Sequence, residues 1–205
     1  KLRYPIVNIS PAKSLATKPI IETGLLVIFA IVIAIVVRMF LLQLFYIPSS
    51  SMEPYLQIDD NIFVNKMAYD FHDIERGDVV VLKAPESITL NDPEIKDLVK
   101  RVIGLPGEIV EGRCDNNAES CIVKVYVTKP GSKPKLLNEP YLSIDLKYSV
   151  YKPFEPISVP SNSVLLLGDN RGNSQDGRFF GPVNTNDIIG RAFLRIWPLG
   201  RAGLL

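Results

Sequence analysis

A long apolar stretch near the N-terminus constrains the fold of this chain more than any other feature. Residues 24–37 read GLLVIFAIVIAIVV, and the nearest charged residues on either side are Glu22 and Arg38. A helix needs about 20 apolar residues to cross the roughly 30 Å hydrocarbon core of a bilayer. Residues 20–40 have this length, and the long side chain of Arg38 can reach the interface from the end of the helix. The stretch predicts a transmembrane helix.

Two other structures are consistent with an apolar stretch of this kind: a buried core helix and a cleaved signal peptide. A core helix usually carries a polar stripe on one face, whereas here apolar side chains occupy every face. A signal peptide ends in a small-residue cleavage site, and no such site follows this stretch. The transmembrane helix is therefore assigned to residues 20–44.

Charged residues on the two sides of the helix predict its orientation. The preceding segment carries four basic residues and no acidic one, and after Arg38 the next basic residue is Lys66. Basic residues are retained on the cytoplasmic side of a membrane. Residues 1–19 are therefore expected in the cytoplasm, and residues 45–205 on the outer (trans) face of a plasma or thylakoid-type membrane. The protein is expected to be single-pass.

The rest of the chain predicts one mainly β domain. Seven short strands rich in Val, Ile and Leu are expected, bounded by turn residues such as Gly and Pro. They span residues 61–66, 78–83, 98–103, 109–110, 122–128, 163–167 and 188–197. No second segment has the long apolar period of a helix. The segments 129–135 and 153–160, which contain several prolines, predict surface loops or the base of an insertion.

Composition narrows the functional class. Lys and Arg number 23 and Asp and Glu 22, which gives a net charge of +1, whereas nucleic-acid-binding domains are usually strongly basic. A content of 47% hydrophobic residues argues against a disordered acidic or basic tail. One His and two Cys exclude multi-His metal sites and four-Cys zinc sites. Neither a metal nor a nucleic acid is expected as a partner.

Three segments carry residues suited to catalysis. They are YIPSSSMEP at 46–54, DLVKRVIGLPGE at 97–108 and GDNRGNSQDGR at 168–178. Each has a plain structural alternative: a polar linker for the serines, an edge-strand lysine that discourages aggregation for Lys100, and a turn or calcium loop for the third. Apolar residues flank the serines, which argues against a linker, and the third segment lacks the acidic pattern of an EF-hand loop.

The available side chains restrict the choice of nucleophile. The only histidine, His72, lies in the polar segment FHDIERGD, which does not favour a Ser-His-Asp triad and leaves a Ser-Lys pair. A lysine with an ordinary pKa of about 10.4 needs a bias of roughly 4–5 kcal/mol against its charged form for its pKa to reach about 7. Burial supplies shifts of this size. Lys100, between the apolar residues Leu98 and Val102, is placed for such burial.

In this order after a membrane anchor, the three segments resemble those of the type I signal peptidases. The resemblance covers nearly the whole chain and rests on the sequences IPSSSMEP, KRVIGLPGE and GDNRGNSQDGR. It implies a mainly β fold, with a mostly antiparallel β-sheet catalytic domain that carries an extended loop or insertion. It also implies a membrane-bound serine endopeptidase that removes the signal peptides of exported preproteins, cutting after small side chains without a cofactor.

The resemblance also implies a role for individual side chains. Ser51 is expected to be the nucleophile and Lys100 the general base. Ser49 is expected to stabilise the oxyanion through its hydroxyl, together with the backbone N–H of Ser51. Ser174 is expected to hydrogen-bond the Lys100 amine and orient it. Two further residues of the third segment, Asp176 and Arg178, are expected to form a supporting ion pair.

The substrate is expected to bind as an added strand in a shallow apolar pocket. By their positions in the motifs, the residues expected to form the walls are Phe45, Ile47, Pro48, Met52, Leu56, Leu98 and Val99. The alternative to a peptidase is a membrane-anchored β domain that binds a partner without catalysis. A soluble Ser-Lys autoprotease that controls transcription is disfavoured by the apolar stretch and by the lack of a DNA-reading segment.

Two cysteines, Cys114 and Cys121, flank the polar sequence DNNAES. Outside the cytoplasm a disulfide between them is physically permitted. Closing so short a loop stabilises a fold by about 2–3 kcal/mol in the chain-entropy account. The sequence leaves open whether they are bonded or are two free thiols.

Overall fold

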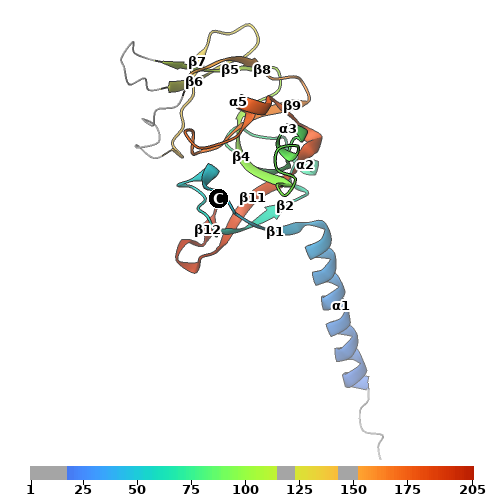
Figure 1. Ribbon diagram of the computed structural model, residues 1–205. Helices are drawn as coiled ribbons and strands as arrows, with labels where there is room; N and C mark the ends of the chain where they lie inside the picture. The colour runs from blue at the N-terminus through green and yellow to red at the C-terminus, as the bar shows by residue number, and fades with distance from the viewer. Residues whose placement is uncertain (1–17, 115–122, 143–151) are drawn as a thin grey trace, which may run out of the picture. The chain divides into compact units, whose positions relative to one another are not determined.

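A computed structural model describes residues 18–114, 123–142 and 152–205 of the chain (Figure 1). The described residues fall into two compact units, which divide between Met39 and Phe40. Helix α1 (Lys18–Phe40) makes up almost all of the described part of the first unit. The second unit contains the sheets and the predicted catalytic segments.

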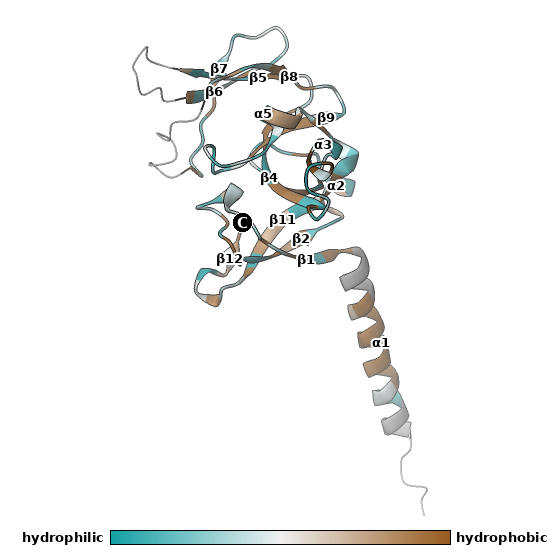
Figure 2. Ribbon diagram, viewed as in Figure 1, coloured by the Kyte–Doolittle hydropathy of each residue, from teal (hydrophilic) through white to brown (hydrophobic). Residues whose placement is uncertain are grey.

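The middle part of α1 is apolar, as Figure 2 shows by its colour. Large side chains along it, such as Leu26, Phe29 and Ile35, have 51–68% of their surface exposed. The helix ends at Phe40, four residues before the predicted end, because residues Leu42–Tyr46 form a strand. That strand hydrogen-bonds along its whole length to a neighbour in the second unit, a pairing that the hydropathy of the stretch does not reveal.

Among the helices of the described residues, none combines the length and the apolarity that a bilayer crossing requires.

Two antiparallel sheets form the second unit. The larger runs in the order β1-β2-β11-β3-β4-β9-β10, with β12 paired to β11. Its strands are β1 (Leu42–Tyr46), β2 (Asn61–Asn65), β3 (Val79–Lys83), β4 (Asp97–Gly104), β9 (Ser163–Leu167), β10 (Val183–Asn184), β11 (Ile188–Trp197) and β12 (Gly203–Leu204). The smaller sheet runs in the order β7-β6-β5-β8, with β5 (Ile109–Cys114), β6 (Val123–Thr128), β7 (Lys135–Leu136) and β8 (Phe154–Ser158). The predicted mainly β, antiparallel fold is confirmed.

The helices of the second unit are all short. They are α2 (Ala68–Phe71), α3 (Glu86–Thr89) and α5 (Gly177–Phe180), with the 3-10 turns η1 (Ser50–Met52), η2 (Thr185–Asp187) and η3 (Leu199–Arg201). Each of the seven predicted strands is present. The segment 153–160, predicted as a loop, instead contains β8. This strand lies at the edge of the smaller sheet, and Pro156 falls where its pairing with β5 is irregular, a position that tolerates proline.

Apolar strand sequences are continuous in β3 and β9 because both faces of these strands are buried. In β3, Val79 and Val81 pack into one apolar cluster and Val80 and Leu82 into another. The residues of β9 are divided between two clusters in the same way. Strand β4 lies between β3 and β9, so Lys100 and the residues around it are carried into the interior.

Candidate active site

The serine segment is held in place by a loop more than 100 residues away in the sequence. Turn η1 presents Ser51, whose carbonyl accepts a hydrogen bond from the backbone N–H of Asn170 at 3.1 Å. The side-chain amide of Asn170 donates to the carbonyl of Ser50 at 3.1 Å, and that of Asn173 donates to the Ser50 hydroxyl at 2.9 Å. The loop that follows β9 therefore fixes the backbone on which Ser51 stands.

Lys100 reaches this serine from the middle of β4. Its Nζ lies 2.8 Å from Oγ of Ser51, and the hydroxyl of Ser49 lies 3.3 Å from the same oxygen. The structure thus brings together three polar groups that the sequence separates by up to 51 positions. A nucleophile and a base at hydrogen-bonding distance are the geometry that covalent catalysis requires.

Burial changes the acid–base chemistry of this amine. Only 2% of Lys100 is exposed, and the loss of hydration lowers its pKa from 10.5 to about 8. The charge of Arg178 also lowers this pKa, whereas Asp176 and Asp169 partly oppose the shift. At neutral pH the fraction of neutral amine is therefore far larger than for a lysine in water.

The structure corrects the predicted role of Ser174. Its hydroxyl is buried and makes no hydrogen bond with the described residues, so the expected bond to the Lys100 amine is absent. The hydroxyl is instead packed against the Cα of Gly168, where an added Cβ would lie 2.2 Å from it. The amine of Lys100 is directed to Ser51, which leaves Ser174 outside the pair.

Asp176 and Arg178 form a bidentate ion pair with two contacts of 2.8 Å. Asp176 is fully buried, and its carboxylate also accepts the backbone N–H of Gly168 at 2.9 Å. The pair therefore closes the loop from Gly168 to Arg178 on itself. It also places two opposite charges near Lys100.

The residues predicted as pocket walls separate into three groups. Ile47, Met52 and Leu56 are at most 2% exposed and form part of the core beneath the serine segment. Phe45 and Val99 are half-buried against that same cluster, and Pro48 is exposed. Leu98 packs against a different cluster, formed by residues of β3, β4, β9 and β10, so the structure does not bring it together with the others.

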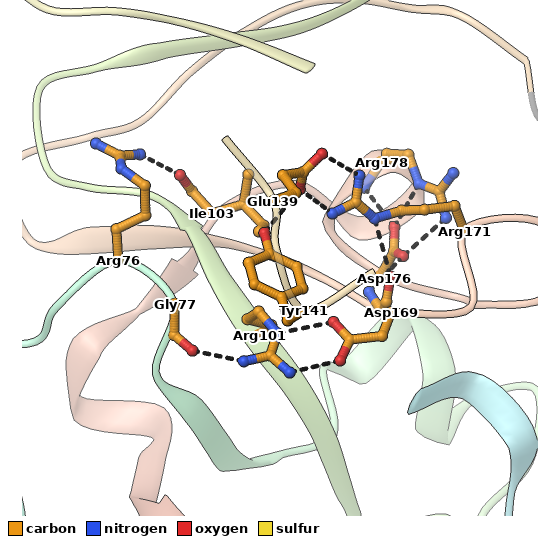
Figure 3. A network of polar contacts seen from close by, with 11 residues as sticks. Arg76, Gly77, Arg101, Ile103, Glu139, Tyr141, Asp169, Arg171, Asp176 and Arg178 are labelled. Carbon is orange, nitrogen blue, oxygen red and sulfur yellow. Dashed lines mark hydrogen bonds and ion pairs between the residues drawn. The ribbon is translucent and has the colours of Figure 1, made fainter. Parts of the chain in front are cut away.

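Several buried charges beside the pair were not predicted from the sequence (Figure 3). Arg101, the neighbour of Lys100, makes a bidentate ion pair with Asp169 at 2.8 and 2.5 Å. Arg171 is fully buried and pairs with Glu139. The sequence could have indicated the burial of Arg101 and Asp169, because Arg101 lies within an apolar strand and Asp169 lies just after one. Glu139 lies in the sequence LLNEPYL, outside every predicted strand and motif, and carried no such indication.

Other predicted features lie away from the pair or outside the described residues. Cys114 is disulfide-bonded, and Cys121 lies outside the described residues. His72 is exposed at the end of α2. Within residues 18–114, 123–142 and 152–205, no group of His, Cys, Asp and Glu is placed to hold a metal ion.

Comparison with known proteins shows to which family the chain belongs. The family described as "Signal peptidase, peptidase S26" matches residues 20–197. The "Probable signal peptidase I-2" of Synechocystis is 38% identical over 90% of this chain and 77% of its own length. The "Signal peptidase I" of Leptolyngbya laminosa is 35% identical over 98% of this chain and 94% of its own length. The chain is a member of the signal peptidase family.

A crystal structure of a signal peptidase I from Enterococcus faecalis is 27% identical and covers 58% of this chain and 97% of its own, at a TM-score of 0.41. The family assignment rests on the sequence matches. Like its relatives, this peptidase is a serine endopeptidase that removes signal peptides from preproteins, which sets aside the non-catalytic alternative.

Gly168 gives a sharp test of the contact between the loop and the serine segment. A Cβ at this position would lie 2.5 Å from the carbonyl oxygen of Ser51, whereas one at Gly172 in the same loop meets nothing within 4 Å. We expect Gly168→Ala to lower kcat/KM for a preprotein on the order of 10²-fold, because a displacement of about 1 Å costs that much. Gly172→Ala is the matched control. Equal activity of the two variants would contradict the prediction.

Proposed function

We propose that Ser51 and Lys100 are the catalytic dyad of this signal peptidase. Neutral Lys100 accepts the proton of Ser51 as Oγ attacks the scissile carbonyl, and a covalent acyl-enzyme forms. The protonated amine then gives its proton to the leaving amine of the mature protein. Lys100 next activates a water molecule that hydrolyses the acyl-enzyme. The contact of 2.8 Å between a buried amine and this hydroxyl is the observation that carries the proposal.

The tetrahedral intermediate needs hydrogen-bond donors for its oxyanion. The hydroxyl of Ser49 and the backbone N–H of Ser51 are the proposed donors. The position of the Ser49 hydroxyl, 3.3 Å from Oγ of Ser51, supports this role. Removing one oxyanion donor typically lowers kcat by about 10²–10³-fold.

Small side chains of the signal peptide are proposed to bind above the core cluster beside Ser51. Ile47, Met52 and Leu56 fill the interior there and form a floor. Phe45 and Val99, which are half-buried, are proposed to line the pocket together with the exposed Pro48. A floor that is already packed leaves a shallow pocket, which favours small side chains over large ones. The substrate backbone is proposed to add as a strand.

Helix α1 is proposed to anchor the peptidase in a bilayer as a single transmembrane segment, within residues 20–44. Contiguous exposed apolar side chains along the helix support this, because such a surface is unfavourable in water. The basic residues of the segment 1–19 support a cytoplasmic location for it. The domain from residue 45 to 205 then lies on the outer face of a plasma or thylakoid-type membrane, where signal peptides emerge.

The dyad is tested by cleavage of a preprotein. We expect Ser51→Ala and Lys100→Met each to lower kcat/KM on the order of 10⁴-fold or more, because members of a catalytic pair act as a unit. His72→Ala is the control and leaves cleavage unchanged. The kcat/KM of the wild type should rise with pH with a midpoint near 8 and then level off, since only neutral Lys100 accepts a proton. A Lys100→Met variant with wild-type activity would contradict the assignment.

The membrane topology is tested by protease accessibility. Protease added outside intact cells or sealed right-side-out vesicles should digest the domain after residue 45, because that domain is expected on the outer face. A tag placed before residue 1 should be protected, and it serves as the internal control. Protection of the domain would overturn the proposed orientation.

A further inference from the structure

Arg101 is immobilised at the position next to Lys100 on β4. Its guanidinium pairs with Asp169 through two hydrogen bonds and donates to the carbonyl of Gly77 at 2.8 Å. Two tyrosine rings lie against it, with centroids 4.5 Å away for Tyr55 and 4.1 Å away for Tyr141. Figure 3 shows the ring of Tyr141 over the guanidinium and the fork of Arg101 facing Asp169. Any shift of this side chain is therefore opposed from several directions.

Glu139, two residues before Tyr141 in the chain, binds a second buried arginine, Arg171. Its carboxylate binds both terminal nitrogens of Arg171, and it accepts the hydroxyl of Tyr141 at 2.7 Å. Arg171 has a fully covered side chain and donates from Nε to the carbonyl of Gly168 at 3.1 Å. One short piece of chain thus contacts both Arg171, within the loop 168–178, and Arg101, which pairs with Asp169 of that loop.

This piece of chain, residues 137–142, is here called the brace. It follows β7, and its first residue, Leu137, donates a backbone hydrogen bond to Val125 of β6 at 2.9 Å. Leu137 and Tyr141 pack against the apolar cluster that β4, β5, β6 and β9 share, and Leu142 is 6% exposed. The brace is therefore anchored in the smaller sheet while its polar side chains act on the larger one.

We propose that the brace is a positioning segment for the reaction, which holds Lys100 against Ser51 through Tyr141 on Arg101 and Glu139 on Arg171. This proposal rests on the dyad proposed above. None of the brace residues contacts the substrate in this scheme.

Both members of the dyad depend on the groups that the brace holds. Arg101 is the next residue after Lys100, so the two share the same backbone. Arg171 holds the carbonyl of Gly168, and the loop starting there binds the serine segment through Asn170. Loosening the brace therefore frees the strand that carries the base and the loop that fixes the nucleophile at the same time.

The charges that face Lys100 come from the same loop. Asp169, Asp176 and Arg178 all lie in it, and Arg101 on β4 is neutralised by Asp169. If the loop moves away, water reaches the amine and favours its charged form, so a higher pH is needed for activity. Burial raises the pKa of Tyr141 above its ordinary value, so its hydroxyl stays protonated across the pH range of the assay.

The test compares two tyrosines that each stack on an arginine, in the whole chain of 205 residues purified in detergent. Tyr141→Leu removes the ring from Arg101, and Tyr126→Leu removes one from the exposed Arg113, 5.1 Å away. We expect Tyr141→Leu to raise the midpoint of the pH profile of kcat/KM by about one unit, which lowers neutral-pH activity about tenfold. The KM stays unchanged, and Tyr141→Phe, which keeps the ring, restores the midpoint. Tyr126→Leu behaves as the wild type.

A second pair of variants covers the case in which Tyr141→Leu does not fold. Glu139→Gln removes the charge that pairs with buried Arg171, and Glu155→Gln on exposed β8 is its matched control. We expect Glu139→Gln to lower kcat severalfold at unchanged KM. The positioning role would be overturned if Tyr141→Leu kept the wild-type midpoint and Glu139→Gln kept the wild-type kcat. In that outcome Ser51→Ala and Lys100→Met would remain inactive, so the dyad itself would still stand. Cleavage by those last two variants would instead refute the dyad itself.

Discussion

The exclusion of water from one amine is the constraint on which the rest of the site depends. Lys100 is carried into the interior because β4 lies between two strands that are buried on both faces. The lowering of its pKa from 10.5 to about 8 corresponds to about 3 kcal/mol of lost stability. This cost is present below about pH 8, where the folded protein must bury the charge. It is relieved as pH rises toward 10.5, because only the unfolded chain still binds the proton there.

A single polar loop supplies most of the order around that amine. Between Gly168 and Arg178 it holds the serine segment, pairs with Arg101 and closes on itself through Asp176. A loop with this many buried charges is stable only if each charge has a partner, since an unpaired buried charge is costly. The brace completes this pairing from the smaller sheet. Two sheets that are separate in hydrogen bonding are thus joined through the site.

Periodicity and motif were sufficient for the larger features. Apolar runs such as residues 164–167 predict strands because both faces are buried. The roles expected of Ser51 and Lys100 came from the resemblance of their motifs to a known family, not from their spacing in the sequence. Strand β1 was missed because its residues continue the apolar stretch of α1, and β8 because it contains Pro156 at a sheet edge. Pairing with a distant strand decided both cases, and pairing is not visible in local hydropathy.

The contacts that Glu139 and Tyr141 make with distant arginines could not be predicted from the sequence. Glu139 and Tyr141 lie in a stretch whose composition is that of an ordinary surface loop, and only folding brings them to Arg171 and Arg101. The hydrogen bond expected from Ser174 failed for a related reason. Its hydroxyl packs against a glycine, and the direction of one side chain depends on packing that a motif does not specify.

Direct titration of the Lys100 amine tests the central claim. Protein labelled with ¹³C at the lysine Cε positions gives one NMR signal for each lysine, and Lys100→Met identifies the signal of interest by its loss. The account predicts that this signal titrates near pH 8, well below the ordinary lysine value of about 10.4. A Lys100 signal with its midpoint at about 10.4 would contradict it.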